Sequence, residues 1–205
     1  MSITIEVCVD SLSGAKLAQE LGADRLEVCG NLSIGGTSPS AGLLRLVRKA
    51  VDLPIHCFLR PRSGDSLRTP EEKEILLADI AFAKESGVQG IVCGALNADG
   101  TIDEEFIRQM VGAARPLAFT SDRAFDNCAD AFAAMEVLKA LGVNYLLTSG
   151  QQDDIVDGLP LMMQLQAVCG ELAIMPGGGI TPENVTQILD TLRPANIHFS
   201  GSLMK

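Results

Sequence analysis

The sequence lacks tryptophan, has one tyrosine and two histidines, and carries no excess of positive charge. Its 16 lysines and arginines stand against 26 aspartates and glutamates, which gives a formal net charge of -10. A protein that binds nucleic acid or an anionic membrane surface needs basic patches, so this balance argues against both partners. No uncharged apolar run approaches the ~18 residues that cross a bilayer. Residues 1–6 lack the basic start and the apolar stretch of a signal peptide, so we expect a cytoplasmic protein.

Several catalytic motifs are absent as well. The sequence contains neither the G-x-S-x-G nucleophile elbow nor a G-x-x-x-x-G-K-[ST] phosphate loop. Residues 10–14, which follow the first predicted strand, do not form a dinucleotide-binding fingerprint. Two histidines cannot build a three-histidine zinc site. Five of the six lysines fall on predicted helices, whereas a Schiff-base aldolase needs its lysine on a barrel strand.

The cysteines do not form any C-x-x-C pair, which argues against a structural zinc site built on close pairs. In a reducing compartment they are thiols rather than disulfides. Most buried cysteines simply fill space as small hydrophobic residues, and that interpretation applies to each of the six: Cys8, Cys29, Cys57, Cys93, Cys128 and Cys169.

Short apolar runs alternate with longer segments of helical period along the whole chain. The runs predict strands at 3–9, 25–29, 55–60, 90–93, 117–120, 144–148, 172–175 and 196–200. The intervening segments predict helices at 12–21, 41–50, 70–86, 103–114, 128–141, 155–169 and 182–192. Thr69-Pro70 and Thr181-Pro182 place a capping hydroxyl before a proline, as at many helix starts.

Eight strands at the spacing of βα units predict a TIM-like (β/α)8 barrel, as one domain over residues 1–205. A doubly wound sheet is the alternative, but it would have fewer strands and a glycine-rich turn after the first. The chain ends five residues after the last strand, so the barrel lacks its last helix. We expect a partner subunit to cover this seam, which predicts a homo-oligomer, with a dimer as the simplest form.

Two neighbouring strands carry the same Glu-x-Cys pattern. Because side chains alternate along a strand, Glu6 shares one face with Cys8, and Glu27 shares one face with Cys29. If these faces point into the barrel, two acids and two thiols lie near its mouth, and the buried acids need counter-charges. Arg60 and Arg123 are the predicted counter-charges. The thiols are either soft metal ligands or packing residues.

Further candidate residues follow later strands. Asp122 and Arg123 follow the fifth strand, where a barrel places substrate or metal groups, although a solvated loop is the alternative. The loops after strands seven and eight often hold phosphate in this fold. Glycines there leave backbone N–H groups open to an anion, although a tight turn also uses glycine. The predicted cradle consists of Gly177, Gly178, Gly179, Gly201 and Ser202.

These segments together resemble the CutC copper homeostasis family. The matching stretches lie at 6–10, 22–31, 60–65, 94–100, 123–126, 147–150 and 175–180, in family order over nearly the whole chain. The resemblance implies a cytosolic, often oligomeric TIM-like barrel that binds Cu(I), with Cys8 and Cys29 as thiolate ligands. Such ligands suit Cu(I) because it is a soft ion. The chain departs from the family pattern at Ser121-Asp122 and along residues 198–202.

Two functions therefore remain open. The first is copper homeostasis through Cu(I) bound by the two thiols. The second is a barrel enzyme of lyase, isomerase or hydrolase type that acts on a small anionic or phosphorylated metabolite. In that enzyme Glu6 or Glu27 would be the general acid or base, with Asp122 as a further catalytic candidate. Arg60 and Arg62 would hold the anion above the glycine cradle.

Overall fold

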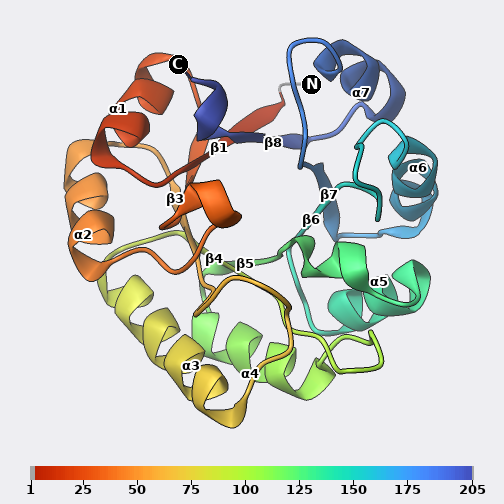
Figure 1. Ribbon diagram of the computed structural model, residues 1–205, viewed down its shortest axis with the longest axis horizontal. Coiled ribbons are helices and arrows are strands. Elements are labelled where there is room, and N and C mark those ends of the chain that lie inside the picture. The colour runs from red at the N-terminus through yellow and green to blue at the C-terminus, as the bar shows by residue number, and fades with distance from the viewer. Residues whose placement is uncertain (1–2, 205) are drawn as a thin grey trace.

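Among the residues that the structure describes, eight parallel strands form a ring at the centre, and seven α-helices surround them (Figure 1). The structure is a computed structural model that describes residues 3–204. The strands are β1 (Thr4–Val9), β2 (Arg25–Val28), β3 (Ile55–Phe58), β4 (Gly90–Cys93), β5 (Ala118–Ser121), β6 (Tyr145–Thr148), β7 (Ala173–Pro176) and β8 (Asn196–Ser200). The α-helices are α1 (Leu12–Glu20), α2 (Ala41–Ala50), α3 (Pro70–Glu85), α4 (Glu104–Ala114), α5 (Ala131–Ala140), α6 (Leu159–Val168) and α7 (Val185–Leu192).

Side-chain caps define where most of the helices begin. Thr69 caps α3 through a full capping box, in which its hydroxyl accepts from the Glu72 N–H and the Glu72 carboxylate accepts from the Thr69 N–H. Asp103 and Asp130 accept hydrogen bonds in the same way at the starts of α4 and α5. Each cap satisfies a backbone N–H that the helix itself leaves without a partner.

Three helices begin three or four residues later than the sequence pattern predicts, and short 3₁₀ helices occupy part of the connections. α5 begins three residues late because Asp130 caps it, and the 3₁₀ helix η2 (Arg123–Asn127) precedes that cap. α7 begins at Val185 because Thr181 closes a local turn instead of capping the helix. The other 3₁₀ helices are η1 (Leu32–Ile34) and η3 (Gly201–Leu203).

The strands separate an apolar outer layer from a polar interior. In β1, Val7 and Val9 pack outward in the main hydrophobic core, and Leu26 and Val28 of β2 do the same. The intervening side chains point into the barrel, where β1 and β2 pair Glu6 with Arg25 and Cys8 with Glu27. Both Glu-x-Cys faces therefore point into the barrel.

The sheet follows the order β7-β6-β5-β4-β3-β2-β1-β8, so β7 and β8 are its two ends. These end strands lie close together but share no hydrogen-bonded ladder among the described residues. A Cβ at Gly177, just after β7, would lie 3.0 Å from the His198 Cβ on β8. After β8 the described chain forms only η3, so the predicted TIM-like barrel without its last helix is confirmed. Among the described helices, none is long and apolar enough to cross a membrane.

Candidate functional site

A cavity of about 660 Å³ opens where the strands end and the βα loops begin. Its lining brings together most of the residues that the sequence singles out, from six different strands or strand ends. This is the end of the barrel at which (β/α)8 proteins carry their functional residues. The predicted site residues in its lining are Cys8, Glu27, Cys29, Arg60, Asp122, Arg123, Gly178, Gly179 and Ser202.

Two thiols meet on one side of this cavity. The Sγ atoms of Cys8 and Cys29 lie 3.4 Å apart, and both residues are buried. Phe58 and Val92 pack around them, so the pair has an apolar surround inside an otherwise polar barrel. The hydrogen bond with Cys29, burial and the nearby charge of Glu27 together raise the pKa of the Cys8 thiol well above its ordinary value. Cys8 is therefore a protonated thiol at neutral pH.

A fully buried carboxylate, Glu6, holds Arg25 and His198 inside the barrel. Its Oε2 accepts a 2.5 Å hydrogen bond from Arg25 Nε, and its Oε1 lies 2.8 Å from His198 Nδ1. Burial raises the pKa of Glu6, but the His198 hydrogen bond and the charges of His198, Arg25 and His56 outweigh it and lower the pKa to about 2. Glu6 is thus a permanent anion that fixes the ring of His198.

The counter-charge predicted for the buried acids was wrong. Arg25 on β2 neutralises Glu6, and its guanidinium also lies over the Tyr145 ring at 4.7 Å. Arg60 lies beyond the end of β3 and donates to the carbonyls of Gly35, Gly36 and Gly64. The physical reason is where the strands end. β3 ends at Phe58, so Arg60 belongs to the following loop, whereas Arg25 lies on β2 and shares its inward face with Glu27.

Glu27 faces the cavity with part of its hydrogen-bonding capacity unused. Its Oε2 lies 3.8 Å from His198 Nε2, and its buried Oε1 has no hydrogen-bond partner among the described residues. Burial is the main reason that the pKa of Glu27 is raised to about 6, with His198 opposing the shift and Glu6 adding to it. A buried carboxylate that titrates at about pH 6 is typical of a group that works on a ligand.

The sequence analysis gave no role to the two histidines or to Arg25. His198 lies between Glu6 and Glu27, and the charges of these two carboxylates raise its pKa against the opposing effect of burial. His56 is buried beside Glu6, and burial lowers its pKa to about 4, so it is neutral. The usable signal was the strand alternation, which places Arg25 on the face of Glu27 and His198 on the face of Ser200.

Asp122 and Arg123 lie on the opposite side of the cavity. Asp122 is buried and accepts a 2.9 Å hydrogen bond from the Ala124 N–H, and burial raises its pKa. Arg123 donates to Asp126 and to the Ser149 hydroxyl, with much of its guanidinium still exposed. The structure therefore brings both predicted residues to the cavity, with Arg123 as the positive group nearest to the glycine loop.

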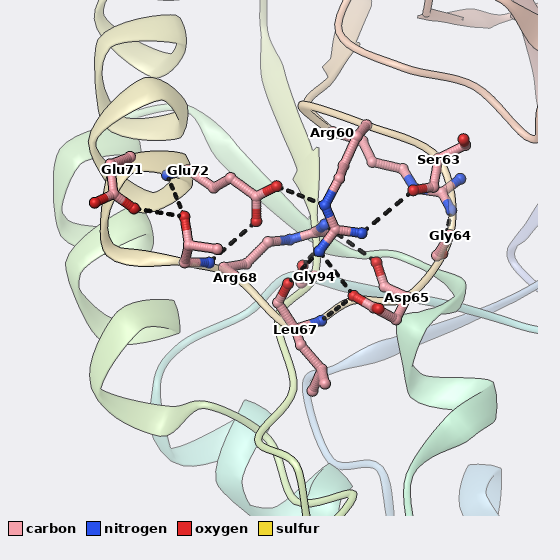
Figure 2. A network of polar contacts seen from close by, with 11 residues as sticks. Arg60, Ser63, Gly64, Asp65, Leu67, Arg68, Glu71, Glu72 and Gly94 are labelled. Atoms are coloured by element: carbon pink, nitrogen blue, oxygen red, sulfur yellow. Dashed lines mark hydrogen bonds and ion pairs between the residues drawn. The ribbon is translucent and has the colours of Figure 1, made fainter.

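Arg60 and Arg62 both lie in the loop after β3, but only Arg60 lines the cavity. Figure 2 shows the network there, in which Asp65 caps the Leu67 N–H, Arg60 reaches the Gly64 carbonyl and Arg68 reaches the Gly94 carbonyl. Arg62 donates to Glu72 and Asp65 in the same network and lies outside the cavity lining. Its structural partners hold it in the loop, so the structure brings Arg60 but not Arg62 to the cavity.

The predicted glycine cradle divides into two parts. Gly178 and Gly179 line the cavity with positive φ angles of 95° and 78°, and their backbone N–H groups carry no hydrogen bond to another described residue. A Cβ at Gly178 would lie 2.6 Å from the Arg123 guanidinium carbon, so this arginine covers the loop. Gly177 and Gly201 instead serve close packing, the latter against the Cys8 carbonyl. Ser202 lines the cavity and its N–H donates to Ser200.

We expect the metal-free Glu27→Gln variant to be more stable than the wild type above about pH 6. The pKa of Glu27 is raised from 4.5 to about 6, so its ionised form disfavours the folded state. Its favourable contribution is complete below pH 4.5 and is lost as the pH rises through 6, a change of about 2 kcal/mol. Urea unfolding at acidic and alkaline pH measures this. Equal stability of the two proteins at alkaline pH would contradict it.

The fold and site define a (β/α)8-barrel protein with a buried dithiol, two carboxylates and a histidine at the carboxyl ends of its strands. The CutC family model matches residues 3–203, and the chain belongs to the CutC family. The human copper homeostasis protein cutC homolog is 44% identical over 96% of this chain and 72% of its own length. The family protein CutC of Photobacterium profundum is 40% identical over 98% of this chain and 82% of its own length.

Solved structures agree with this assignment. A crystal structure of CutC from Streptococcus agalactiae has a TM-score of 0.92 at 27% identity, covering 98% of this chain and all of that one. A phosphonopyruvate hydrolase crystallised with oxalate and Mg²⁺ has a TM-score of 0.72 at 12% identity, covering 97% of this chain and 75% of that one. The second similarity shows the barrel fold alone.

Proposed function

We propose that this protein acts in copper homeostasis by binding one Cu(I) ion between the thiolates of Cys8 and Cys29. The observation that carries the proposal is the 3.4 Å separation of the two Sγ atoms beside the cavity. Cu(I) is soft and prefers thiolate ligands. The apolar side chains of Phe58 and Val92 pack against the pair, and such a surround suits a soft ion.

The charge around the thiols favours a cation. Glu6 and Glu27 lie within the same barrel interior, and Asp122 lies on the opposite side of the cavity. Two thiolate ligands and one Cu(I) ion form a complex with one net negative charge. The raised pKa of Cys8 makes the affinity increase with pH, because the proton competes with the copper ion for the same sulfur.

The test is a titration of the reduced, metal-free protein with Cu(I) against a competing chelator. We expect one equivalent to bind, and the affinity to fall at least a hundredfold, about 2.7 kcal/mol, in the Cys8→Ser, Cys29→Ser double variant. Cys169→Ser is the matched control, because this thiol lies near the end of α6, far along the chain from both Glu-x-Cys strands. Cu(I) binding that survives the double substitution would refute the proposal.

A second candidate function rests on a different observation. The free N–H groups of Gly178 and Gly179 and the Arg123 guanidinium face the cavity that also contains Glu27. This arrangement fits an enzyme that binds a small anion and moves a proton with Glu27. Inorganic phosphate should then raise the unfolding temperature of the wild type but not of Arg123→Gln. No stabilisation of the wild type would remove this candidate.

A further inference from the structure

Three side chains at the bottom of the cavity form a group that the two thiols alone do not explain. One ligand atom each from Cys8, Glu27 and His198 lies within 4.8 Å of the other two, and all three residues are buried. They come from β2, β1 and β8, which are neighbouring strands of the sheet, and the pairing of β1 with both of the others brings them together. We propose that these three residues form a binding site for a divalent ion of zinc type, with Cys29 outside the ligand set.

The donor types match this class of ion. Zn²⁺ binds cysteine sulfur, histidine nitrogen and carboxylate oxygen, with bonds of about 2.0–2.3 Å. Tetrahedral geometry with these bonds sets the ligand atoms about 3.3–3.6 Å apart. The 3.8 Å between His198 Nε2 and Glu27 Oε2 is therefore near the required spacing, and the whole group needs to contract by only roughly 1 Å.

His198 is already oriented as a metal ligand. Its Nδ1 lies 2.8 Å from Glu6 Oε1, and the carboxylate accepts a hydrogen bond from the Nδ1–H group. This leaves Nε2 to face Glu27 and the cavity, where a cation takes the place of the Nε2 proton. A carboxylate behind the ligating histidine is the usual second layer of a zinc site, because it fixes the tautomer and the ring plane.

An unpartnered oxygen of Glu27 is the independent observation that points to a cation. Its Oε1 is buried without a hydrogen-bond partner among the described residues. A buried carboxylate oxygen without a donor is costly in free energy, and a coordinated cation removes that cost. Three protein ligands leave a fourth position open toward the cavity, as in catalytic rather than structural zinc sites. Water or an oxygen of a small anion would occupy that position.

The proposal separates two ions within one cavity. Cu(I) prefers the soft thiol pair of Cys8 and Cys29, whereas Zn²⁺ also accepts the nitrogen and oxygen of His198 and Glu27. Cys8 is common to both sets, so the two ions exclude each other. The zinc site does not depend on the copper proposal, because each set contains a residue that the other lacks.

Four substitutions in the full-length, reduced protein test this assignment by competition of Zn²⁺ alone with a chromophoric chelator. We expect Glu27→Gln and Cys8→Ser to weaken Zn²⁺ binding at least tenfold. His198→Asn should do the same, because asparagine keeps a donor for Glu6 and removes Nε2. Cys29→Ser should change the Zn²⁺ affinity less than threefold while it weakens Cu(I) binding, and Glu27→Gln should weaken Zn²⁺ binding far more than Cu(I) binding.

The outcomes distinguish the two proposals. Zn²⁺ binding that is indifferent to Glu27→Gln and His198→Asn overturns the zinc site, whatever Cu(I) does. Loss of Zn²⁺ in Cys29→Ser to the same degree as in Cys8→Ser overturns it as well, because the ion would then sit on the thiol pair. Zn²⁺ binding with the expected pattern supports the site even if Cu(I) fails to bind. Thermal unfolding of each metal-free variant confirms that a loss of binding is not a loss of the fold.

Discussion

Replacing Glu6 by alanine should destabilise the fold by about 3–5 kcal/mol. The substitution leaves Arg25 in the barrel interior without its 2.5 Å partner, and Arg25 is only 6% exposed. It also removes the carboxylate that holds His198 Nδ1. An uncompensated buried charge is the physical origin of the loss. Urea unfolding at neutral pH measures the change in the free energy of unfolding.

Two further variants control for this interpretation. Glu104→Ala removes an exposed carboxylate paired with Arg108 on α4, and it should change stability by less than about 1 kcal/mol. Glu6→Leu combined with Arg25→Met removes both buried charges and should recover much of the loss. If the double variant is as unstable as Glu6→Ala, packing rather than charge explains the effect. A loss below about 1 kcal/mol in Glu6→Ala itself would show that the pair contributes little.

The second large effect is a loss of stability in acid that passes through the same carboxylate. The pKa of Glu6 is about 2 in the fold against an ordinary value of 4.5. The stabilisation from its ionised form is therefore complete above pH 4.5 and is lost as the pH falls through 2. The full effect is about 3 kcal/mol, or about 1.4 kcal/mol for each pH unit in that interval.

Comparison with Glu6→Gln isolates this contribution. Glutamine keeps the size of the side chain but has no charge to lose, so the stability difference between the wild type and the variant should shrink as the pH falls below 4.5. Acid unfolding of other carboxylates occurs in both proteins and largely cancels in the difference. A difference that stays constant down to about pH 3 would mean that Glu6 does not titrate with the lowered pKa.

The fold could be predicted because its signals are local. Each strand is a short run of Val, Ile and Leu, and each turn carries a capping or glycine signal within a few residues, as at Thr69. The misplaced starts of α5 and α7 have the same origin. A capping hydroxyl at Thr181 fits either a helix or a local turn, and only the packing of the loop decides between them.

The site could be predicted only in part. Strand alternation was enough to bring Glu6, Cys8, Glu27 and Cys29 to one interior. The contact of Glu6 with His198 joins residues 192 positions apart, and it exists because β8 pairs with β1. No local pattern contains that pairing or its register. The prediction of Arg60 as the counter-charge fails for the same lack of a local signal, because the exact end of β3 depends on its neighbouring strands.

The seam between β7 and β8 couples the site to the closure of the barrel. Among the described residues, backbone hydrogen bonds join all the other pairs of neighbouring strands, whereas no such ladder joins these two strands. His198 on β8 lies close to the backbone of Gly177, which follows β7. His198 therefore lines the cavity and also lies at the seam between β7 and β8. A ligand that binds His198, Glu27 and Cys8 together would bind only while the seam is closed. By thermodynamic linkage, the free energy of local opening of the seam would then rise with the fraction of protein that carries the ligand.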